Sequence, residues 1–338
     1  MASENSTEIQ CVTNVLNTYL RWKSLNGPPR GHEIYHPSAF GNCLRKMQYQ
    51  RYVERGHLKV EPEMHEAKTV RIFDTGHTMH ARWTKYWEDL GVLRGVWECN
   101  NPSCGLWDDL GKYIGFPLIK NDDPATAVPP SPRMYGRENR IGVFKPTACA
   151  CGHKEFKYHE ITVSDKEMNF RGHVDQVLDF SNFGGGATFK KGNPVKVLFK
   201  DEDLPKKPIV NDMKSINSFG YKSKLEGGNV PFGYKVQVNI YLNLLDLDYG
   251  MLYFENKDDC QTKAIQIHRD PELWAKIREQ AFKMNDMVDD LLLPPPRPYT
   301  QEDYECKYCE FRSICHTAGI WNDPGLTEKR RSFYGDFY

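Results

Sequence analysis

Ten cysteines are the feature that most constrains how these 338 residues can fold. Eight of them fall into two groups, whereas Cys11 and Cys260 stand apart and are expected to be ordinary thiols. The first 20 residues contain no basic stretch followed by an apolar core, so we expect no signal peptide and a cytoplasmic location, or the host cytoplasm for a viral protein. Disulfides are rare in such a compartment, where clustered thiols more often bind metal. Each group is therefore predicted to be a metal site.

The C-terminal group is spaced C-x2-C-x5-C and consists of Cys306, Cys309 and Cys315. Three thiolates on so short a segment can bind one face of a metal centre, and a closed site needs a fourth ligand. The candidates are the adjacent His316 and the distant Cys43. Zinc accepts a histidine as the fourth ligand, whereas a [4Fe–4S] cluster favours four thiolates. The spacing leaves both open, and a Cys43 ligand would join the two ends of the chain.

The second group consists of two close pairs: Cys99 and Cys104, then Cys149 and Cys151. A glycine follows the second cysteine of each pair, as in the two turns of a zinc ribbon, which predicts a structural zinc site. The spacings C-x4-C and C-x-C depart from the usual C-x2-C, and His153 offers an alternative ligand. Unliganded or redox-active thiols are the competing interpretation. We expect residues 97–156 to form a zinc-ribbon-like insertion that the metal organises and that contacts DNA or a partner.

Composition excludes some functions and leaves others to local features. The 45 basic and 45 acidic residues cancel, so any surface that binds nucleic acid must be local. No apolar run approaches the roughly 20 residues that span a bilayer, so no membrane partner is expected. The length suits one large domain or two ordinary ones.

An acidic constellation follows the second cysteine group. Residues 168–180 alternate apolar and polar side chains as a strand does, and 195–199 and 208–215 are two further predicted strands. In such an antiparallel meander Asp175 and Asp212 converge at one end, and Lys214 shares a strand face with Asp212. Two carboxylates and a lysine suit phosphodiester hydrolysis with Mg²⁺ or Mn²⁺. The alternative for an isolated D-x-K is a surface ion pair.

Two predicted helices flank these strands. One places His80, Trp83 and Trp87 on a single face, and the other places Gln237 and Tyr241 one turn apart. Each pattern alone is more typical of a packed helix, with the histidine as a core or capping residue and the Gln–Tyr pair as a polar rim.

The order of these motifs is more specific than any one of them. Cys43, the helix TGHTMH, GHVD, DMK, QVNIY and C-x2-C-x5-C follow one another along the chain. This series resembles the RecB-like iron–sulfur branch of the PD-(D/E)XK nucleases, which includes the CRISPR-associated spacer-acquisition exonuclease and AddB-type nucleases. The resemblance covers roughly residues 33–90 and 158–318.

The resemblance implies roles for individual residues. It makes Asp175 and Asp212 metal ligands, together with the Met213 carbonyl and His80, and Lys214 the catalytic lysine. Gln237 and Tyr241 match a motif that positions the substrate. The four cluster ligands it implies are Cys43, Cys306, Cys309 and Cys315, which favours [4Fe–4S] there. The polar link before residue 208 departs from the pattern, because it offers the rival carboxylates Asp201, Glu202 and Asp203.

We therefore expect an α/β, restriction-endonuclease-like core with a central mixed sheet flanked by helices, and chain ends joined by the Fe–S cluster. The predicted parts are an N-terminal helical part (1–96), the insertion (97–156), the nuclease core (157–300) and a C-terminal cysteine segment (301–338). The residues predicted to contact DNA are Arg45, Lys46, Tyr49 and Arg51.

The expected function is that of a Mg²⁺- or Mn²⁺-dependent DNA exonuclease acting on single-stranded or end-processed DNA in recombination, replication or repair. A catalytically silent DNA-binding or replication accessory protein is the alternative, and a redox sensor built on the cluster is a second one. Expected partners are DNA, replication or recombination proteins, and further copies of the chain.

Overall fold

The computed structural model describes residues 4–26, 31–60, 64–102, 104, 134–137, 139–183, 204–226, 230–289, 297–307 and 309–317. Within these ranges, none of the helices has the length and apolar character that crossing a bilayer requires. The predicted strand at 195–199 and the rival carboxylates Asp201, Glu202 and Asp203 lie outside the described residues.

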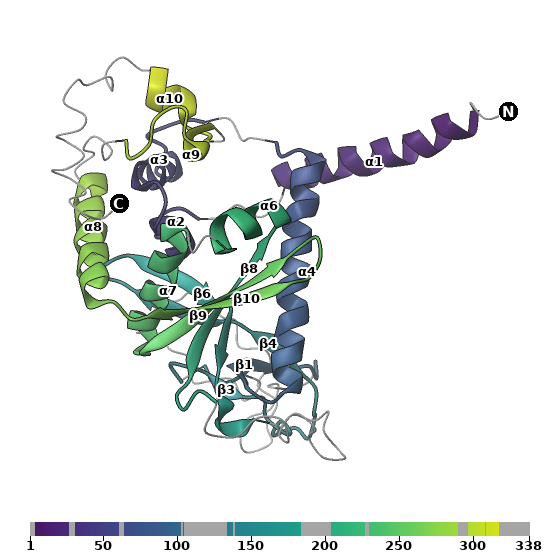
Figure 1. The fold of residues 1–338 in the computed structure, drawn as a ribbon, viewed down its shortest axis with the longest axis vertical. Helices are drawn as coiled ribbons and strands as arrows, with labels where there is room; N and C mark the ends of the chain where they lie inside the picture. The colour runs from purple at the N-terminus through teal and green to yellow at the C-terminus, as the bar shows by residue number, and fades with distance from the viewer. Residues whose placement is uncertain are drawn as a thin grey trace.

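A mixed sheet forms the centre of the described chain (Figure 1). Its path runs β10–β9–β8–β7–β1–β2, and β3 and β4 also pair with β1. The strands are β1 (Leu93–Cys99), β2 (Met134–Tyr135), β3 (Val143–Phe144), β4 (Phe156–His159), β7 (Gln176–Leu178), β8 (Ile209–Ile216), β9 (Tyr249–Asn256) and β10 (Thr262–His268). Only β8 and β9 pair in parallel among these described strands. The expected mixed α/β architecture is confirmed at this level.

The parallel pair is joined by helix α7 (Phe232–Leu245), because parallel neighbours need a crossover connection. The first five residues of β8 are buried, which is typical of a central strand covered on both faces. Helix α7 supplies Val238, Leu242 and Leu245 to the core cluster that also contains Val210 of β8 and Leu252 of β9. These contacts fix α7 against the strand that carries Asp212.

Residues 168–180 form two strands and not the single one predicted. Strand β6 (Phe170–Val174) pairs with β5 (Ile161–Asp165) in a separate two-stranded sheet, and β7 belongs to the central sheet. Asp175 is the bend between β6 and β7. Alternation stops at this bend, where the polar Asp175 and Gln176 adjoin and the apolar Val177 and Leu178 follow, and all three residues of β7 are buried.

Strand β1 connects the predicted insertion to the central sheet. Its first residues pair with β7, and its last four pair with β4. The predicted boundary at residue 97 therefore falls inside a strand. Part of the insertion, residues 105–133, lies outside the described residues.

Helix α4 (Ala67–Asp89) crosses the sheet as a long rod, and α1 (Glu4–Asn26) extends away from the body beside the start of α4 (Figure 1). Helix α8 (Pro271–Asp289) packs with α3 and α7. The remaining helical elements are α2 (Pro37–Phe40), α3 (Leu44–Glu54), η2 (Phe180–Asn182), α6 (Ser218–Gly220), η4 (Tyr221–Glu226), α9 (Tyr304–Lys307) and α10 (Arg312–Thr317).

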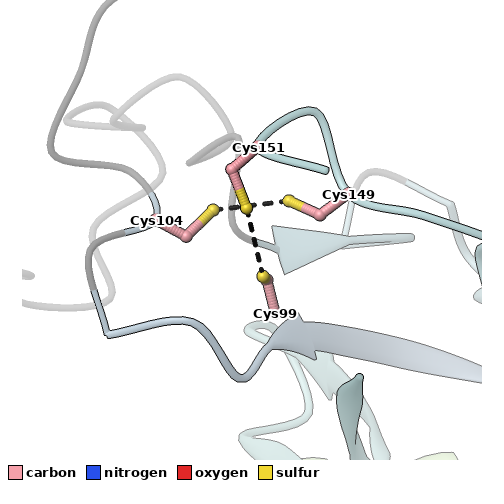
Figure 2. A group of neighbouring side chains, drawn as sticks. All are labelled: Cys99, Cys104, Cys149 and Cys151. Carbon is pink, nitrogen blue, oxygen red and sulfur yellow. Dashed lines mark hydrogen bonds between the residues drawn. The ribbon is translucent and has the colours of Figure 1, made fainter. Parts of the chain in front are cut away.

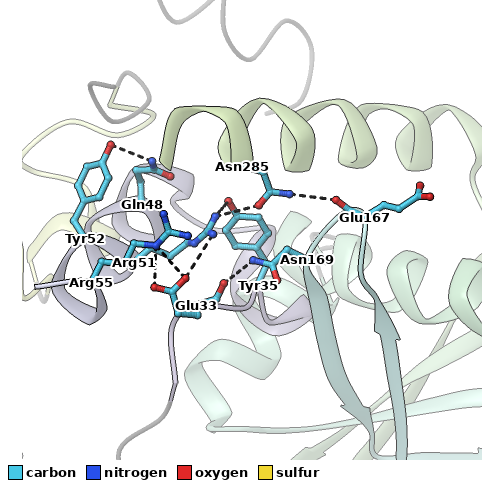
Figure 3. Close-up of polar contacts among 9 residues, drawn as sticks. All are labelled: Glu33, Tyr35, Gln48, Arg51, Tyr52, Arg55, Glu167, Asn169 and Asn285. Carbon is cyan, nitrogen blue, oxygen red and sulfur yellow. Dashed lines mark hydrogen bonds and ion pairs between the residues drawn. The ribbon is translucent and has the colours of Figure 1, made fainter. Parts of the chain in front are cut away.

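Helix α3 is tied to the body by a buried arginine (Figure 3). Arg51 Nη1 donates to Tyr35 Oη at 2.6 Å and to Asn285 Oδ1 at 3.1 Å, and its other amine lies 3.7 Å from Glu33. Arg55 donates to both oxygens of Glu33. Helix α3 is thus held between the segment before α2 and the last turns of α8.

The burial of α3 corrects the prediction that its basic and aromatic residues contact DNA. Arg45, Tyr49 and Arg51 are each no more than 4% exposed, and Arg45 donates to Tyr49 Oη. Their partners include residues far along the chain, which spacing within the helix cannot reveal. Lys46 is the member of the predicted set that stays partly exposed, with 37% of its side-chain surface open.

Candidate functional site

Asp175 and Asp212 meet because of the register between β7 and β8. Gln176 pairs with Asn211 in this antiparallel ladder, so the preceding Asp175 stands opposite Asp212. Asp175 Oδ2 accepts from the Met213 backbone N–H at 2.9 Å. The two predicted carboxylates are therefore brought together, one at a bend and one within a buried strand.

Lys214 lies on the same face as Asp212, as the alternation of a strand requires. Its ammonium lies 2.6 Å from Asp212 Oδ2, and 17% of its side chain is exposed. Lys214 Nζ also stands 5.1 Å from the centroid of the Tyr234 ring. Burial lowers the pKa of Lys214, but the carboxylates of Asp212 and Asp175 outweigh burial and raise it. The lysine is therefore held in its charged form.

Helix α7 supplies the second partner of Asp212. Gln237 Nε2 donates to Asp212 Oδ1 at 2.9 Å, and Tyr241 Oη donates to the His173 carbonyl at 2.9 Å. Gly172 permits this approach, because a Cβ there would lie 2.8 Å from Pro37 Cδ and 3.2 Å from the Tyr241 ring. The predicted Gln–Tyr pair thus faces the acidic residues and ties α7 to β6.

His80 approaches the same group from α4. Its Nδ1 lies 3.6 Å from Asp175 Oδ2, with one third of the side chain exposed. Burial, followed by the charge of Lys214, lowers the pKa of His80.

Arg82 and Trp83 both donate to the buried carboxylate of Glu255 on β9, and Thr84 accepts from Gln176. Three successive side chains thus anchor α4 one turn beyond His80.

Burial and neighbouring charges shift the pKa values of both carboxylates. Burial raises the pKa of Asp212 to about 6, with Lys214 opposing and Asp175 adding to the shift. Burial also raises the pKa of Asp175, and Lys214 and the Met213 N–H oppose it. Asp212 Oδ2 makes no hydrogen bond of ordinary geometry although Lys214 Nζ is close. A buried carboxylate with spare acceptor capacity suits a hard cation.

The donor types fit Mg²⁺ or Mn²⁺, but the ligand atoms are not fully gathered. Two carboxylates, a histidine and the adjacent backbone are ligands of the kind these ions accept. Among the described residues, however, Asp175, Asp212 and His80 do not place three ligand atoms within 4.8 Å of one another. A small movement of side chains would be needed to enclose one ion.

Glu160 belongs to this neighbourhood and was not predicted. It follows β4 immediately, and its pKa rises to about 7 through burial of its carboxylate and the charges of Asp175 and Asp212. The residue as a whole is nonetheless solvent-exposed, so its carboxylate stands at the edge of the site and not inside it. Glu160 precedes a stretch with the two-residue period of a strand and lies 15 residues before Asp175. This position alone is a weak sequence signal for a site residue.

The first metal-binding group brings together the four predicted cysteines of the insertion (Figure 2). Their Sγ atoms all lie within 4.8 Å of one another, with Cys99 to Cys151 at 3.7 Å and Cys104 to Cys149 at 3.4 Å. Zn–S bonds of about 2.3 Å in a tetrahedron place sulfurs about 3.8 Å apart. The four cysteines can therefore bind one metal ion, and the alternative ligand His153 is outside the group.

Backbone turns and neighbouring polar groups support this group. The Cys149 N–H donates to the His153 carbonyl at 2.7 Å, and Gly152 takes a positive φ of 81° to complete the turn. Tyr135 Oη donates to Cys149 Sγ at 3.1 Å. The His153 backbone N–H is the main cause that lowers the pKa of Cys151 to about 6. This contact favours the thiolate form of Cys151 that a metal requires, whereas burial raises the pKa values of Cys99 and Cys104.

The second cysteine group also converges across the chain. Cys43, Cys306, Cys309 and Cys315 line one cavity, with Cys43 at the start of α3 and the others around α9 and α10. No three of these cysteines place their sulfurs within 4.8 Å of one another in the described structure. His316 lines the same cavity, but its Nδ1 faces Arg297 at 3.0 Å. The four cysteines predicted to bind the cluster are thus brought to one cavity, without the close sulfur packing of the Cys99 group.

The fold and these groups define a mixed α/β protein with a four-cysteine group that can bind a metal ion and an Asp–Asp–Lys cluster centred on the buried Asp212. No protein-family model and no curated protein matches the chain. Among solved structures it is similar to the crystal structure of SSO0001, with a TM-score of 0.40, 13% identity and coverage of 90% of this chain and 96% of that one. It is also similar to an alkaline exonuclease (LHK-Exo) from Laribacter hongkongensis, with a TM-score of 0.28, 12% identity and coverage of 38% and 55%. Both likenesses are distant and define no function for this chain.

Proposed function

We propose that this protein is a Mg²⁺- or Mn²⁺-dependent DNA nuclease that acts as an exonuclease on single-stranded or end-processed DNA. The observation that carries the proposal is the placement of Asp175 opposite Asp212 with the Lys214 ammonium 2.6 Å from Asp212. A surface ion pair would be exposed, whereas Asp212 is fully buried and Lys214 is mostly so. Burial of this kind, with perturbed pKa values, is typical of functional sites.

Asp175 and Asp212 would hold the metal, with the Met213 carbonyl and His80 beside them. When bound, the ion supplies a Lewis acid and lowers the pKa of a bound water. Gln237 orients the Asp212 carboxylate, and the Met213 N–H orients that of Asp175. Lys214 remains a cation and offsets negative charge that develops on the phosphoryl oxygens. Tyr241 fixes the strand that leads into Asp175.

The two cysteine groups would have different cofactors. The short sulfur distances among Cys99, Cys104, Cys149 and Cys151 support a structural zinc ion. The placement of Cys43, Cys306, Cys309 and Cys315 around one cavity supports a [4Fe–4S] cluster, which takes four thiolate ligands. Such a cluster would clamp α9 and α10 to α3, near the start of the described core.

The proposal is tested with anaerobically purified protein on DNA labelled at the 5′ or the 3′ end, single- and double-stranded, with Mg²⁺ or Mn²⁺. The expected result is metal-dependent release of labelled products that Asp212→Asn abolishes. This variant is a matched control, because the amide oxygen can still accept from Gln237. The pattern of labelled products also gives the direction of degradation.

Two outcomes would overturn the proposal. Cleavage that survives Lys214→Ala would place the chemistry elsewhere on the chain. Absence of cleavage by protein with its full iron and zinc content, in the presence of tight DNA binding, would favour a catalytically silent DNA-binding protein.

A further inference from the structure

A second cavity opens beside the one lined by the Cys43 group. It has a volume of about 310 Å³ and is bounded by the segment around His32 and His36, by α2 and α3, and by Glu305. Cavities of this size, at the lower end of the usual range for ligand sites, accept a group as large as one nucleotide. The proposed chemistry at Asp212 does not use this cavity.

The wall of the cavity meets α7, the helix whose Tyr234 faces Lys214, through a tight contact between α2 and α7. Gly41 and Gly233 allow it, because a Cβ at Gly41 would lie 2.5 Å from Gly233 Cα. Asn42 lines the cavity, and its Oδ1 is 3.0 Å from the Cβ position of Gly233. The next residue is Tyr234, whose ring faces Lys214 Nζ. Asn42 of the cavity wall therefore contacts Gly233, and the next residue of α7, Tyr234, faces the proposed catalytic lysine.

The start of α3 and the residue before its cap carry groups of the kind that bind phosphate and read bases. Lys46 and Gln50 lie one turn apart on α3 and line the cavity, and Asn42, two residues before α3 begins, lines it as well. Lys46 Nζ lies 3.6 Å from Glu310, a loose ion pair at the surface, and Gln50 donates to Glu310. A DNA phosphate can replace the Glu310 carboxylate as the partner of the Lys46 ammonium. Ile34 and Met47 add apolar surface to the same walls, against which a base can pack.

We propose that this cavity binds one nucleotide of a DNA single strand whose adjoining phosphodiester passes Lys214. The inference rests on the proposed function and names the part of the substrate that is held. Lys46, His32 and His36 contact the phosphate, and Asn42 and Gln50 contact the sugar and base edge. A single strand is favoured over a duplex because the cavity has room for one nucleotide and not for a base pair.

The test measures fluorescence anisotropy of a short labelled single strand with Ca²⁺ in place of Mg²⁺, at several salt concentrations. The variants are Lys46→Ala and the double variant Lys46→Ala with His32→Ala. Lys207→Ala is the matched control, because this exposed lysine precedes β8 at the end opposite Lys214. Iron and zinc content and melting temperature confirm that each variant is folded. Lys46→Ala keeps the cap of α3, because the cap is a hydrogen bond from the Lys46 backbone N–H to Cys43 Sγ.

The expected result is about a tenfold loss of affinity in Lys46→Ala and a larger one in the double variant. The slope of log K against log salt should fall by about 0.7 for each phosphate that the variant no longer neutralises, and Lys207→Ala should change neither quantity. Unchanged affinity and slope in both variants would overturn the inference while leaving the nuclease proposal intact. Equal competition by inorganic phosphate and by a mononucleotide would also overturn it. Failure of the parent protein to bind or cleave DNA would instead reject the proposed function.

Discussion

Asp175 stands opposite Asp212 because Gln176 and Asn211 are paired across β7 and β8. The side chains of this neighbouring pair are themselves joined, since Asn211 Nδ2 donates to Gln176 Oε1 at 2.6 Å and Gln176 donates to Thr84 of α4. One buried hydrogen-bonded chain thus links the three elements that carry Asp212, Asp175 and His80. The pairing of β7 with β8 therefore sets the position of Asp175 relative to Asp212, without a contribution from a loop.

Replacing Gln237 by leucine should destabilise the protein and impair catalysis. The change removes the donor to Asp212 Oδ1 and leaves that buried oxygen unsatisfied, which costs about 1–3 kcal/mol. Urea denaturation measures the loss of unfolding free energy. Gln261→Leu, in an exposed turn, is the matched control and should stay within about 0.5 kcal/mol of the parent. Equal stability of both variants would show that Gln237 is not needed to satisfy Asp212.

Asp212→Asn should gain stability relative to the parent as the pH rises. The folded-state pKa of Asp212 is raised from 3.8 to about 6, so its ionised form costs folding free energy above that pH and the cost disappears below about pH 4. The difference between the two proteins should change by on the order of 1–3 kcal/mol between pH 4.5 and pH 7.5. Denaturation without added Mg²⁺ or Mn²⁺ measures this, and a pH-independent difference would contradict the raised pKa.

Cys149→Ser should remove one metal equivalent and loosen the region around β1 and β4. Structural zinc sites contribute folding free energy directly, of about 10–16 kcal/mol in small peptides. We expect loss of zinc by mass spectrometry and faster proteolysis within residues 139–159. Cys260→Ser changes an exposed cysteine outside both groups and should keep the full metal content. Full zinc retention in Cys149→Ser would contradict the four-cysteine site.

Asp179→Asn should destabilise the protein at neutral pH but not in acid. Asp179 lies 2.9 Å from Arg94 and accepts from the Ser181 N–H. Burial raises its pKa, but these partners outweigh burial and lower it below the ordinary value of 3.8. Its stabilisation is therefore present above pH 3.8 and lost as the pH falls through the lower folded-state pKa.

The expected cost of Asp179→Asn is about 1–3 kcal/mol at pH 7. Urea denaturation at pH 7 and at about pH 2, well below the ordinary value of 3.8, measures both ends of this range. Asp246→Asn, which alters an exposed pair with Arg269, should have little effect at either pH. A cost that is the same at both pH values would rule out the ionised carboxylate as its source.

The parts of the site that could be predicted depend on local periodicity. Asp212 with Lys214, and Gln237 with Tyr241, share a face by the repeat of their own strand or helix. The bend at Asp175 was missed because residues 168–180 were read as one strand, although alternation ends at Asp175–Gln176 and all of β7 is buried in the central sheet. Glu160 could not be predicted, because it has no periodic partner in the sequence. Arg51 was misassigned because its partners, such as Asn285, are distant along the chain.

The clamp formed by Arg51 has a consequence for the order in which the chain folds. Arg51 lies in the first sixth of the sequence, and Asn285 is 234 residues further on. During synthesis from the N-terminus, the guanidinium therefore has no α8 to bond with until most of the protein has been made. Contacts of such long sequence separation form late, because the intervening loop must close first. Residues 31–60 are among the first to be translated, but they complete their packing among the last.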